Sequence, residues 1–455
     1  MGPESAAGRT VATLIVCLLS LLGAACGGAA EAPGGQVRIV LITLDTLRHD
    51  VFEGGDPDRA GPSSMPLLGA LARRGLIFDR HYTASSSTQP THASLFTGLH
   101  PWEHGVVRNG VVLDGEAPTV AEILRGEGYQ TSAAVASFPV TSLFGFERGF
   151  DRFDEEFDRE QISEWNDREV QDGSFYRLAN SVTDRALELV DSTPDGNQFF
   201  WFHYFDPHEP YGDTGPSKPV RLPELKQRFK RNGNGEPVAL GRMWRLYRED
   251  VAFMDRHLAR LINSLMGDER YQTHILVTAD HGESIGEGRS VGHGKHLSDV
   301  EVHVPMLILS PGVAPARRSD PCGSVDVFVT LLGLAGLDGR PVDGALGGRD
   351  LLRESTGDAP VLGMRRTFEG PHEERLTDGS ERILDAYRFY LLDDESMVRG
   401  NGERLDVDGA ALTTGREREI LSMFAALEQV VENLHSNEIL DDETQEALKS
   451  LGYAR

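Results

Sequence analysis

Short, nearly continuous apolar runs recur along the chain and predict buried strands. The first covers residues 37–44 (VRIVLITL) and is rich in β-branched side chains. Similar runs follow at 198–205 (QFFWFHYF), 273–278 (THILVT) and 304–309 (VPMLIL). Strands without polar alternation are typical of parallel sheets, in which helices cover both faces.

Helical patterns lie between these runs. Residues 119–128 (TVAEILRGEG) form a capped pattern that ends in a glycine and predicts a helix, and residues 131–137 can form the strand after it. Apolar side chains at helical spacing predict another helix over 246–265. This alternation predicts an α/β fold with a mostly parallel sheet sandwiched by helices.

The pattern changes after about residue 358. Short strand-like runs such as 388–392 are followed by a helical pattern over 420–434. We therefore expect a catalytic domain over residues 37–357 and a smaller C-terminal α+β subdomain over 358–455.

The first residues of the chain indicate export. An apolar segment at 11–22 follows Arg9 and has the length of a signal-peptide core, too short to span a bilayer comfortably. It ends in small residues before Cys26, which resembles a bacterial lipoprotein cleavage site, although Gly23 stands where leucine is preferred. We expect a lipoprotein-type signal peptide at 1–25 and a flexible tether at 26–36.

This leader predicts a location in the cell envelope. A lipid on Cys26 would anchor the protein to a membrane, and the alternatives are plain secretion, to the periplasm or outside, and an uncleaved anchor.

Charge and cysteine content narrow the classes of function. The 455 residues carry 45 Lys plus Arg against 71 Asp plus Glu, a net charge of −26, so nucleic acid is not an expected partner. An anionic substrate would need a local positive site or a metal ion. The three cysteines, two of them in the leader, provide neither a disulfide framework nor a CxxC metal site.

Acidic and histidine residues follow directly after the predicted strands. They are Asp45, Asp206, His208, Asp280 and His281. In open α/β sheets, ligands bind at the carboxyl ends of the strands. One such aspartate is usually a helix cap, but several from distant segments indicate a site. Carboxylates with imidazole are ligands for Ca²⁺, Mn²⁺ or Zn²⁺.

Residues 83–98 (TASSSTQPTHASLFTG) change from a hydroxyl-rich segment to an apolar run that predicts the start of a helix. A helix N-terminus favours a phosphate or sulfate, although an ordinary capping turn has the same pattern. Thr88 offers an oxygen nucleophile that a metal ion can activate. Metal, nucleophile and anion pocket together indicate ester hydrolysis at phosphorus or sulfur.

These motifs resemble the sulfatase family of the alkaline phosphatase superfamily. The family signature C-x-P-S-R-x-x-x-L-T-G, whose cysteine becomes formylglycine, is similar to residues 88–98 (TQPTHASLFTG), with Thr88 in place of the cysteine. The resemblance covers about residues 37–312 in order, with a weaker similarity beyond them. The other matching segments are VLITLDTLRHD (40–50), HGVVRNG (104–110), HYFDPHEPY (203–211), VTADHGE (277–283), GHGK (292–295), VPMLI (304–308) and SLGY (450–453).

The resemblance implies roles for individual residues. Metal ligands would be Asp45, Asp280, His281 and the nucleophile Thr88, and catalytic positions would be Thr88, Asn109, His208, Lys295 and His92. Asn109, His208 and Lys295 match residues that hold the substrate anion or assist the leaving group. His293 matches a ligand of a second metal in the two-zinc phosphodiesterase branch, and a substrate contact is the alternative.

Three departures from the family pattern change the expected metal ligands and anion-binding charges. Thr46 replaces a second acidic ligand, and His92 replaces the signature arginine, so one anion-holding charge is missing. Pro210 stands where the two-zinc pattern has histidine. We therefore favour one divalent ion over two.

The expected function is that of an exported, metal-dependent hydrolase that cleaves phosphate mono- or diesters through a metal-activated Thr88. The alternatives are a sulfuric ester hydrolase without formylglycine, a transferase that passes phosphoryl or phosphoethanolamine groups to envelope glycans, and an inactive binding protein.

Overall fold

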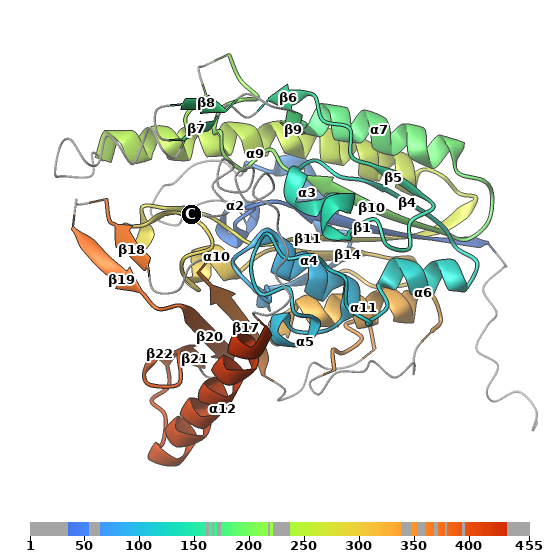
Figure 1. The fold of residues 1–455 in the computed structure, drawn as a ribbon. Helices are drawn as coiled ribbons and strands as arrows, with labels where there is room; N and C mark the ends of the chain where they lie inside the picture. Colours follow the sequence, from blue (N-terminus) through green and yellow to red (C-terminus); the bar gives the residue numbers. More distant parts are fainter. Residues whose placement is uncertain are drawn as a thin grey trace, which may run out of the picture.

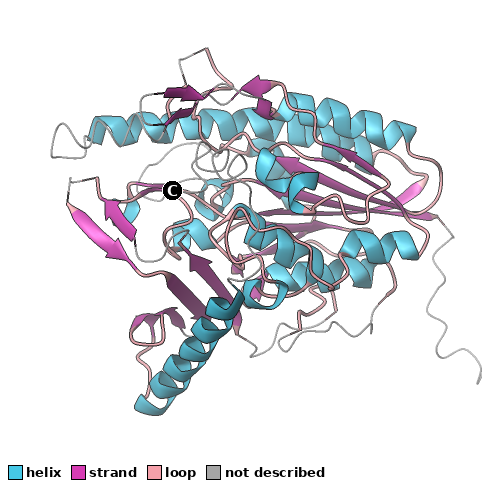
Figure 2. Ribbon diagram, viewed as in Figure 1, coloured by secondary structure: helices cyan, strands magenta, loops and turns pink. Residues whose placement is uncertain are grey.

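The structure is a computed structural model (Figures 1 and 2). It describes residues 35–53, 64–160, 163–165, 168–170, 174–216, 219–221, 237–337, 347–353, 360–367, 372–377, 380–393 and 396–434. The expected signal peptide, nearly all of the tether and the SLGY segment lie outside the described residues.

An eight-stranded sheet forms the centre of the larger domain. Its strand order is β15-β2-β14-β11-β1-β10-β4-β5. The strands are β1 (Gln36–Leu44), β2 (Leu76–Phe78), β4 (Gln130–Ala134), β5 (Arg152–Asp154), β10 (Gln198–Tyr204), β11 (Tyr271–Ala279), β14 (Met306–Leu309) and β15 (Ala316–Arg318). The segment from β11 through β1, β10 and β4 to β5 is parallel. The predicted α/β fold with a mostly parallel sheet is therefore confirmed.

One feature of the sheet differs from the prediction. The predicted strand at 304–309 exists as β14, but it runs antiparallel to β11, and β2 runs antiparallel to β14. A continuous apolar run shows that a strand is buried and does not show its direction.

Helices cover both faces of this sheet (Figures 1 and 2). In β1, alternate side chains point to opposite faces: Ile42 and Leu44 belong to one apolar core and Ile39 and Leu41 to the other. The main helices are α3 (Pro66–Ala72), α4 (Thr88–Thr97), α6 (Val120–Gly126), α7 (Ala179–Ser192), α9 (Pro237–Met266) and α11 (Ser324–Leu334).

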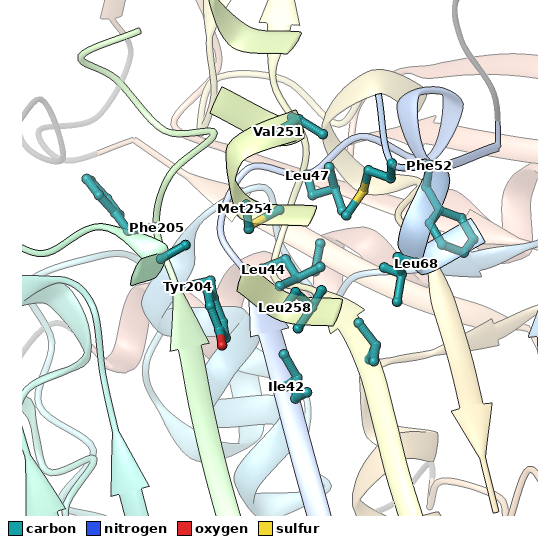
Figure 3. Close-up of a cluster of buried hydrophobic side chains, with 14 of the residues drawn as sticks. Ile42, Leu44, Leu47, Phe52, Leu68, Tyr204, Phe205, Val251, Met254 and Leu258 are labelled. Atoms are coloured by element: carbon teal, nitrogen blue, oxygen red, sulfur yellow. The ribbon is translucent and has the colours of Figure 1, made fainter. Parts of the chain in front are cut away.

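Helix α9 lies across the first face. Val251, Met254 and Leu258 point from this helix toward Ile42 and Leu44 (Figure 3). Burial of each such side chain contributes about 1.5–3 kcal/mol to folding. On the other face α4, α6 and α11 pack against the sheet. None of the described helices is both long and apolar enough to cross a membrane.

The smaller C-terminal unit is antiparallel and carries one long helix. Its sheet has the order β17-β20-β21-β22, formed by β17 (Val361–Arg366), β20 (Tyr387–Leu392), β21 (Ser396–Gly400) and β22 (Leu405–Gly409). Helix α12 (Thr414–Asn433) packs on it through Ile420 and Phe424. This confirms the expected α+β subdomain, while its boundary at residue 358 stays a prediction.

The C-terminal sheet also contacts the segment that precedes α4. The hydroxyl of Tyr390 donates to the carbonyl of Thr83 at 2.6 Å, and the N–H of Met364 donates to the carbonyl of Ala84 at 2.9 Å. The C-terminal unit is therefore attached close to the candidate nucleophile.

Candidate active site

Two aspartates lie side by side at the carboxyl edge of the central sheet. Strands β1 and β11 are parallel neighbours with Leu44 opposite Ala279, so the next residues, Asp45 and Asp280, leave the sheet together. Both side chains are fully buried. His281 follows, and one ligand atom from each of these three residues lies within 4.8 Å of the others. The structure thus brings together three of the predicted metal ligands.

His281 presents its Nε2 atom to the two carboxylates. Its Nδ1 lies 3.0 Å from the carbonyl oxygen of Gly282, which can only accept, so Nδ1 carries a proton, and in the neutral ring that a metal ligand requires, Nε2 has the lone pair. Burial tends to lower the pKa of His281, but the charges of Asp280 and Asp45 outweigh it and raise this pKa, which favours the protonated ring without a cation. Nε2 lies 3.6 Å from Asp280 Oδ2 and 3.8 Å from Asp45 Oδ1. An imidazole held through its other nitrogen is typical of histidine metal ligands.

Burial and charge act differently on the two carboxyl groups. Burial, and then the charge of Asp280, raises the pKa of Asp45 well above its usual range. Burial also tends to raise the pKa of Asp280, but the charge of the protonated His281 outweighs it, so this pKa is lowered. Two buried carboxylates this close need a compensating positive charge before both can ionise.

A divalent cation fits this group of residues. Among the described residues, both carboxylate oxygens of Asp45 and Oδ2 of Asp280 are buried without a hydrogen-bond partner. A buried, uncompensated carboxylate costs on the order of several kcal/mol, and a bound cation would remove that cost. Two carboxylates and an imidazole suit Ca²⁺, Mn²⁺ or Zn²⁺, so these residues form a candidate metal site that does not fix the identity of the ion.

The backbone is strained beside Asp45. Thr46 has a φ of 56°, in the left-handed region that β-branched residues rarely adopt, at a cost of about 1–3 kcal/mol. Its N–H donates to Asp280 Oδ1 at 3.3 Å, and its carbonyl accepts from the Tyr247 hydroxyl at 2.8 Å. These bonds stabilise the turn that directs Asp45 into the site.

Helix α4 begins at Thr88, which faces His281. The segment after the hydroxyl-rich run is the predicted helix, and Ser87 is its N-cap. Thr88 Oγ1 lies 3.2 Å from His281 Nε2, and the hydroxyl donates when that nitrogen has the lone pair. The side chain is fully buried at the positive end of the helix dipole. The hydroxyl thus lies beside the candidate metal ligands, where an anion is stabilised.

Asn109 lies beside the start of the same helix. Its Oδ1 accepts a hydrogen bond from the backbone N–H of Gln89 at 2.9 Å. The side chain of Gln89 is held by the carbonyl of Pro139 and the N–H of Gly110. With Oδ1 engaged, the two Nδ2 donors are the part of Asn109 that can hold an anion near Thr88.

His92 bonds to the protein through both ring nitrogens. Nδ1 lies 2.8 Å from the carbonyl oxygen of Thr88, and Nε2 lies 3.0 Å from the hydroxyl of Thr43. Trp201 Nε1 donates to that hydroxyl at 3.0 Å, which turns the Thr43 proton toward His92. Burial lowers the pKa of His92 to about 3, so the ring is neutral. The geometry favours a positioning role for His92 over direct contact with substrate.

His203 is a site residue that the sequence did not single out. It pairs with Thr43 in the sheet, and its Nε2 lies 3.6 Å from Asp45 Oδ2. The N–H of Ala136 donates to its Nδ1 at 3.3 Å, and burial lowers the pKa of the ring to about 4, so Nε2 carries the proton. A protonated Nε2 cannot ligate a metal, although His92, His203 and Asp280 form a second compact group. His203 therefore lies beside Asp45 as a neighbour of the candidate ligands. The sequence signal that could have identified it is its position near the end of a predicted strand.

His293 and His208 lie next to His281. The ring centroids of His281 and His293 are 4.3 Å apart, and those of His293 and His208 are 5.0 Å apart. The Nδ1 of His208 donates to the carbonyl of Glu209 at 2.8 Å, and burial lowers its pKa to about 3. The Nδ1 of His293 lies 3.3 Å from Glu283 Oε1. Both possible roles of His293, second-metal ligand and substrate contact, stay predictions.

Lys295 follows on the same loop. Gly294 has a φ of 75°, and a Cβ added there would lie 3.1 Å from Ser87 Oγ, so the loop closely approaches the N-cap of α4. Lys295 Nζ donates to the carbonyl of Val291 at 3.1 Å and lies 3.5 Å from Glu374 Oε1. The loop therefore brings the segment with Lys295 to the helix end that carries Thr88.

Asp206 lies outside the candidate metal ligands despite its similar place after a strand. Its Oδ1 accepts a hydrogen bond from the N–H of Ala179, the first residue of α7, at 2.9 Å. Burial raises its pKa to about 8. Asp206 is therefore a helix cap that is largely protonated near neutral pH.

The same fold occurs in solved hydrolase structures. A phosphonate monoester hydrolase from Silicibacter pomeroyi aligns over 89% of this chain and 96% of its own length, with a TM-score of 0.60 and 21% identity. A 2-O GAG sulfatase aligns over 90% and 96%, with a TM-score of 0.63 and 17% identity. These similarities show that the fold is alkaline phosphatase-like.

Sequence similarity identifies the family to which the chain belongs. The model of the Sulfatase family matches residues 38–337, and the chain belongs to that family. Choline-sulfatase from Rhizobium meliloti is 26% identical over 353 residues, 67% of this chain and 68% of the relative. The uncharacterized sulfatase YidJ from Escherichia coli is 23% identical over 319 residues, 61% of this chain and 64% of the relative. The chain thus aligns with slightly less than two thirds of the second relative's length.

Proposed function

We propose that the protein is an exported hydrolase of phosphate mono- or diesters with Thr88 as the nucleophile. The observation that carries this proposal is the position of Thr88, whose hydroxyl lies 3.2 Å from His281 Nε2 at the N-terminus of α4. It stands two residues before Pro90 and ten before Gly98, as the nucleophile of the family signature does. The neighbouring Ser85, Ser86 and Ser87 do not have this spacing.

The choice of phosphorus over sulfur rests on the side chain of threonine. Formylglycine forms by oxidation of a primary Cβ, and the Cβ of Thr88 carries a methyl group, so this residue cannot become the aldehyde. An aldehyde hydrate releases sulfate by breaking its own C–O bond. A sulfated threonine would need water to attack sulfur directly, which is slow, whereas a phosphothreonine can be hydrolysed by in-line displacement.

Each side chain has a role in the proposed reaction. Asp45, Asp280 and His281 would hold a divalent ion, which supplies positive charge that lowers the pKa of a nearby hydroxyl and offsets negative charge on the phosphate. Thr88 Oγ1 loses its proton and forms a bond to phosphorus while the bond to the leaving oxygen breaks, and the leaving group takes up a proton. Water then displaces Thr88, which regains its proton, and releases phosphate from a monoester or a phosphate monoester from a diester.

Three polar side chains assist these two displacements. The Nδ2 donors of Asn109 and the ammonium group of Lys295 hold the phosphate oxygens as negative charge develops on them. The Nδ1 of His208 is engaged by the carbonyl of Glu209, so Nε2 is the atom through which His208 would hold the substrate anion or assist the leaving group.

The relatives support one alternative, a sulfuric ester hydrolase that works without formylglycine. Both relatives described above carry sulfatase in their names. A further relative, the Multifunctional alkaline phosphatase superfamily protein PehA from Trinickia caryophylli, is 25% identical over 397 residues, 68% of this chain and 75% of the relative, and its name does not restrict it to sulfate esters.

A panel of esters tests the proposal. Matched aryl phosphate, phosphodiester, phosphonate and sulfate esters would be supplied with Ca²⁺, Mn²⁺ or Zn²⁺, with and without an acceptor alcohol. We expect the highest kcat/KM on a phosphate ester and, with or without the acceptor alcohol, only the products of hydrolysis: free phosphate from a monoester or a phosphate monoester from a diester. The highest kcat/KM on the sulfate would support the sulfatase alternative, and phosphorylated acceptor would identify a transferase.

A further inference from the structure

The loop that carries Lys295 is held between the two units of the protein. On the side of the catalytic domain, the ring of His293 lies against that of His281, tilted by 35°, and Gly294 approaches Ser87. On the other side lies a hairpin of the C-terminal unit, formed by β18 (His372–Arg375) and β19 (Glu381–Leu384). The position of Lys295 therefore depends on contacts from both units.

Two adjacent glutamates in β18 point to opposite faces of the hairpin, Glu374 toward the loop with Lys295 and Glu373 toward solvent. Glu374 is buried at 1% exposure and pairs in register with Arg382. Glu373 is exposed and pairs with Ile383, which is 69% exposed. Because successive side chains in a strand point to opposite faces, these adjacent glutamates have different surroundings.

Glu374 binds three residues of the loop and one of its own hairpin. Its Oε1 accepts from Ser290 Oγ at 2.6 Å and lies 3.5 Å from Lys295 Nζ. Its Oε2 lies 2.9 Å from His296 Nε2 and accepts from Arg382 Nε at 2.8 Å. Burial tends to raise the pKa of this carboxyl group, but the contacts with His296 and Lys295 outweigh it and lower the pKa below its usual range.

Other contacts fix the two ends of the same loop. The N–H of Thr377 donates to the carbonyl of Arg289 at 2.9 Å. Arg399 in β21 donates to the carbonyl of Leu297 at 2.5 Å and pairs with Asp299 at 2.6 Å. The C-terminal unit thus contacts the loop on both sides of Lys295.

We propose that Glu374 is a positioning residue of the active site, which holds the Lys295 ammonium group ready for the anionic ester. This inference rests on the proposed function, in which Lys295 holds the phosphate. A free lysine side chain loses much rotamer entropy when it binds, and Glu374 restricts it before substrate arrives. The C-terminal unit thereby completes a site whose other residues come from the catalytic domain.

The positioning of Lys295 by Glu374 favours substrate binding, whereas the negative charge of Glu374 opposes it. A carboxylate beside Lys295 weakens the attraction of that ammonium group for an anion. A purely electrostatic role therefore predicts tighter binding when Glu374 is removed, and a positioning role predicts weaker binding. The two roles can be distinguished by the sign of the change in KM.

The test compares Glu374→Ala with its exposed neighbour, Glu373→Ala, on the ester that the wild type hydrolyses fastest. We expect Glu374→Ala to lower kcat/KM about tenfold, mainly through KM, and Glu373→Ala to stay within about twofold of wild type. The double variant Lys295→Ala/Glu374→Ala should match Lys295→Ala, because without the Lys295 ammonium group Glu374 no longer has this role to lose. Glu374→Gln, which preserves the size of the side chain, should give a smaller loss.

Three results would overturn this inference: equal kcat/KM for the two glutamate variants, a lower KM in Glu374→Ala, or additive losses in the double variant. Calorimetric binding of inorganic phosphate or sulfate to the same variants gives a readout without turnover, and equal affinities in Glu374→Ala and Glu373→Ala would also contradict it. A wild type that prefers sulfate esters would refute the proposed function alone, because the variants can be compared on the sulfate ester.

Discussion

The carbonyl oxygen of Thr88 accepts a hydrogen bond from Nδ1 of His92, one turn further along helix α4, at 2.8 Å. The other nitrogen of the ring accepts from Thr43, two residues before Asp45 in β1. This imidazole therefore links the helix that begins at the proposed nucleophile, Thr88, to the strand that precedes the candidate metal ligand Asp45. A neutral histidine at the position of the signature arginine can therefore hold the start of α4 against β1, although it carries no charge for the anion.

We predict that His92→Ala lowers kcat while it changes KM by less than about threefold. The substitution removes the bonds to Thr88 and Thr43 without removing a substrate contact. Loss of a buried ring should also lower the free energy of unfolding by about 2–5 kcal/mol. Steady-state kinetics and urea unfolding would measure these effects.

His100→Ala is the matched control for this prediction. His100 is also buried, but it stacks on Trp102 beyond the end of α4. The substitution His100→Ala should lower the free energy of unfolding and leave kcat per folded molecule unchanged. A His92→Ala enzyme with normal kcat and a strongly raised KM would show that His92 holds the anion instead.

We predict that Asp280→Asn abolishes stoichiometric binding of a divalent ion. The substitution removes one of the two carboxylates that lie within reach of His281 Nε2. Asp206→Asn is the control, because Asp206 also follows a strand but caps α7. Elemental analysis of both purified variants would measure the bound metal. Equal metal in Asp280→Asn and wild type would refute the assignment of this ligand.

The stability of the protein should fall as the pH rises from about 4 to above 8, in part because of Asp206. Burial raises the pKa of this group from 3.8 to about 8, so across this range the folded state retains a proton that the unfolded state has lost. We expect Asp206→Asn to reduce this fall in the free energy of unfolding by at least about 1.4 kcal/mol, the equivalent of one pKa unit.

Urea unfolding at pH 5, 7 and 9 measures this dependence. Asp195→Asn, at a side chain that is 74% exposed, is the control and should follow the wild-type profile. Parallel profiles for wild type and Asp206→Asn would contradict the raised pKa.

The central strands could be predicted because burial on both faces leaves no polar alternation in their sequence. Residues 37–44 and 273–278 became β1 and β11 with ends shifted by at most two residues. Their register could not be read from the sequence, and only the register places Asp45 beside Asp280. The resemblance grouped these two residues before any geometry was known.

Other site residues carry no local signal. Glu374 alternates with exposed residues in a short hairpin and looks like any surface acid until the hairpin packs on the loop near Lys295. For His92 the sequence signal is misleading. Its place in the signature suggests contact with substrate, whereas both of its hydrogen bonds are to the protein. Tertiary contacts, which a single sequence does not show, decide both roles.

Cys26 provides a test of the expected export and lipid anchor. Small residues precede it after an apolar segment, and it lies outside the described residues. We predict that the wild-type protein partitions into the detergent phase of an envelope extract and that Cys26→Ala moves it to the aqueous phase. Partitioning that is the same for both proteins would contradict lipidation at this residue.

Thr88 as the nucleophile of a phosphate ester hydrolase is the central claim. Thr88→Ala removes the hydroxyl beside His281, and Thr97→Ala removes a buried hydroxyl at the far end of the same helix, where it donates to the carbonyl of Ala93. The second variant therefore controls for the loss of a buried threonine from α4.

The most direct measurement is kcat/KM for matched aryl phosphate and aryl sulfate esters on wild type, Thr88→Ala and Thr97→Ala. We predict that wild type and Thr97→Ala prefer the phosphate, and that Thr88→Ala loses at least about a thousandfold on it. A wild type that prefers the sulfate, or a Thr88→Ala enzyme that keeps its phosphatase activity, would contradict the account.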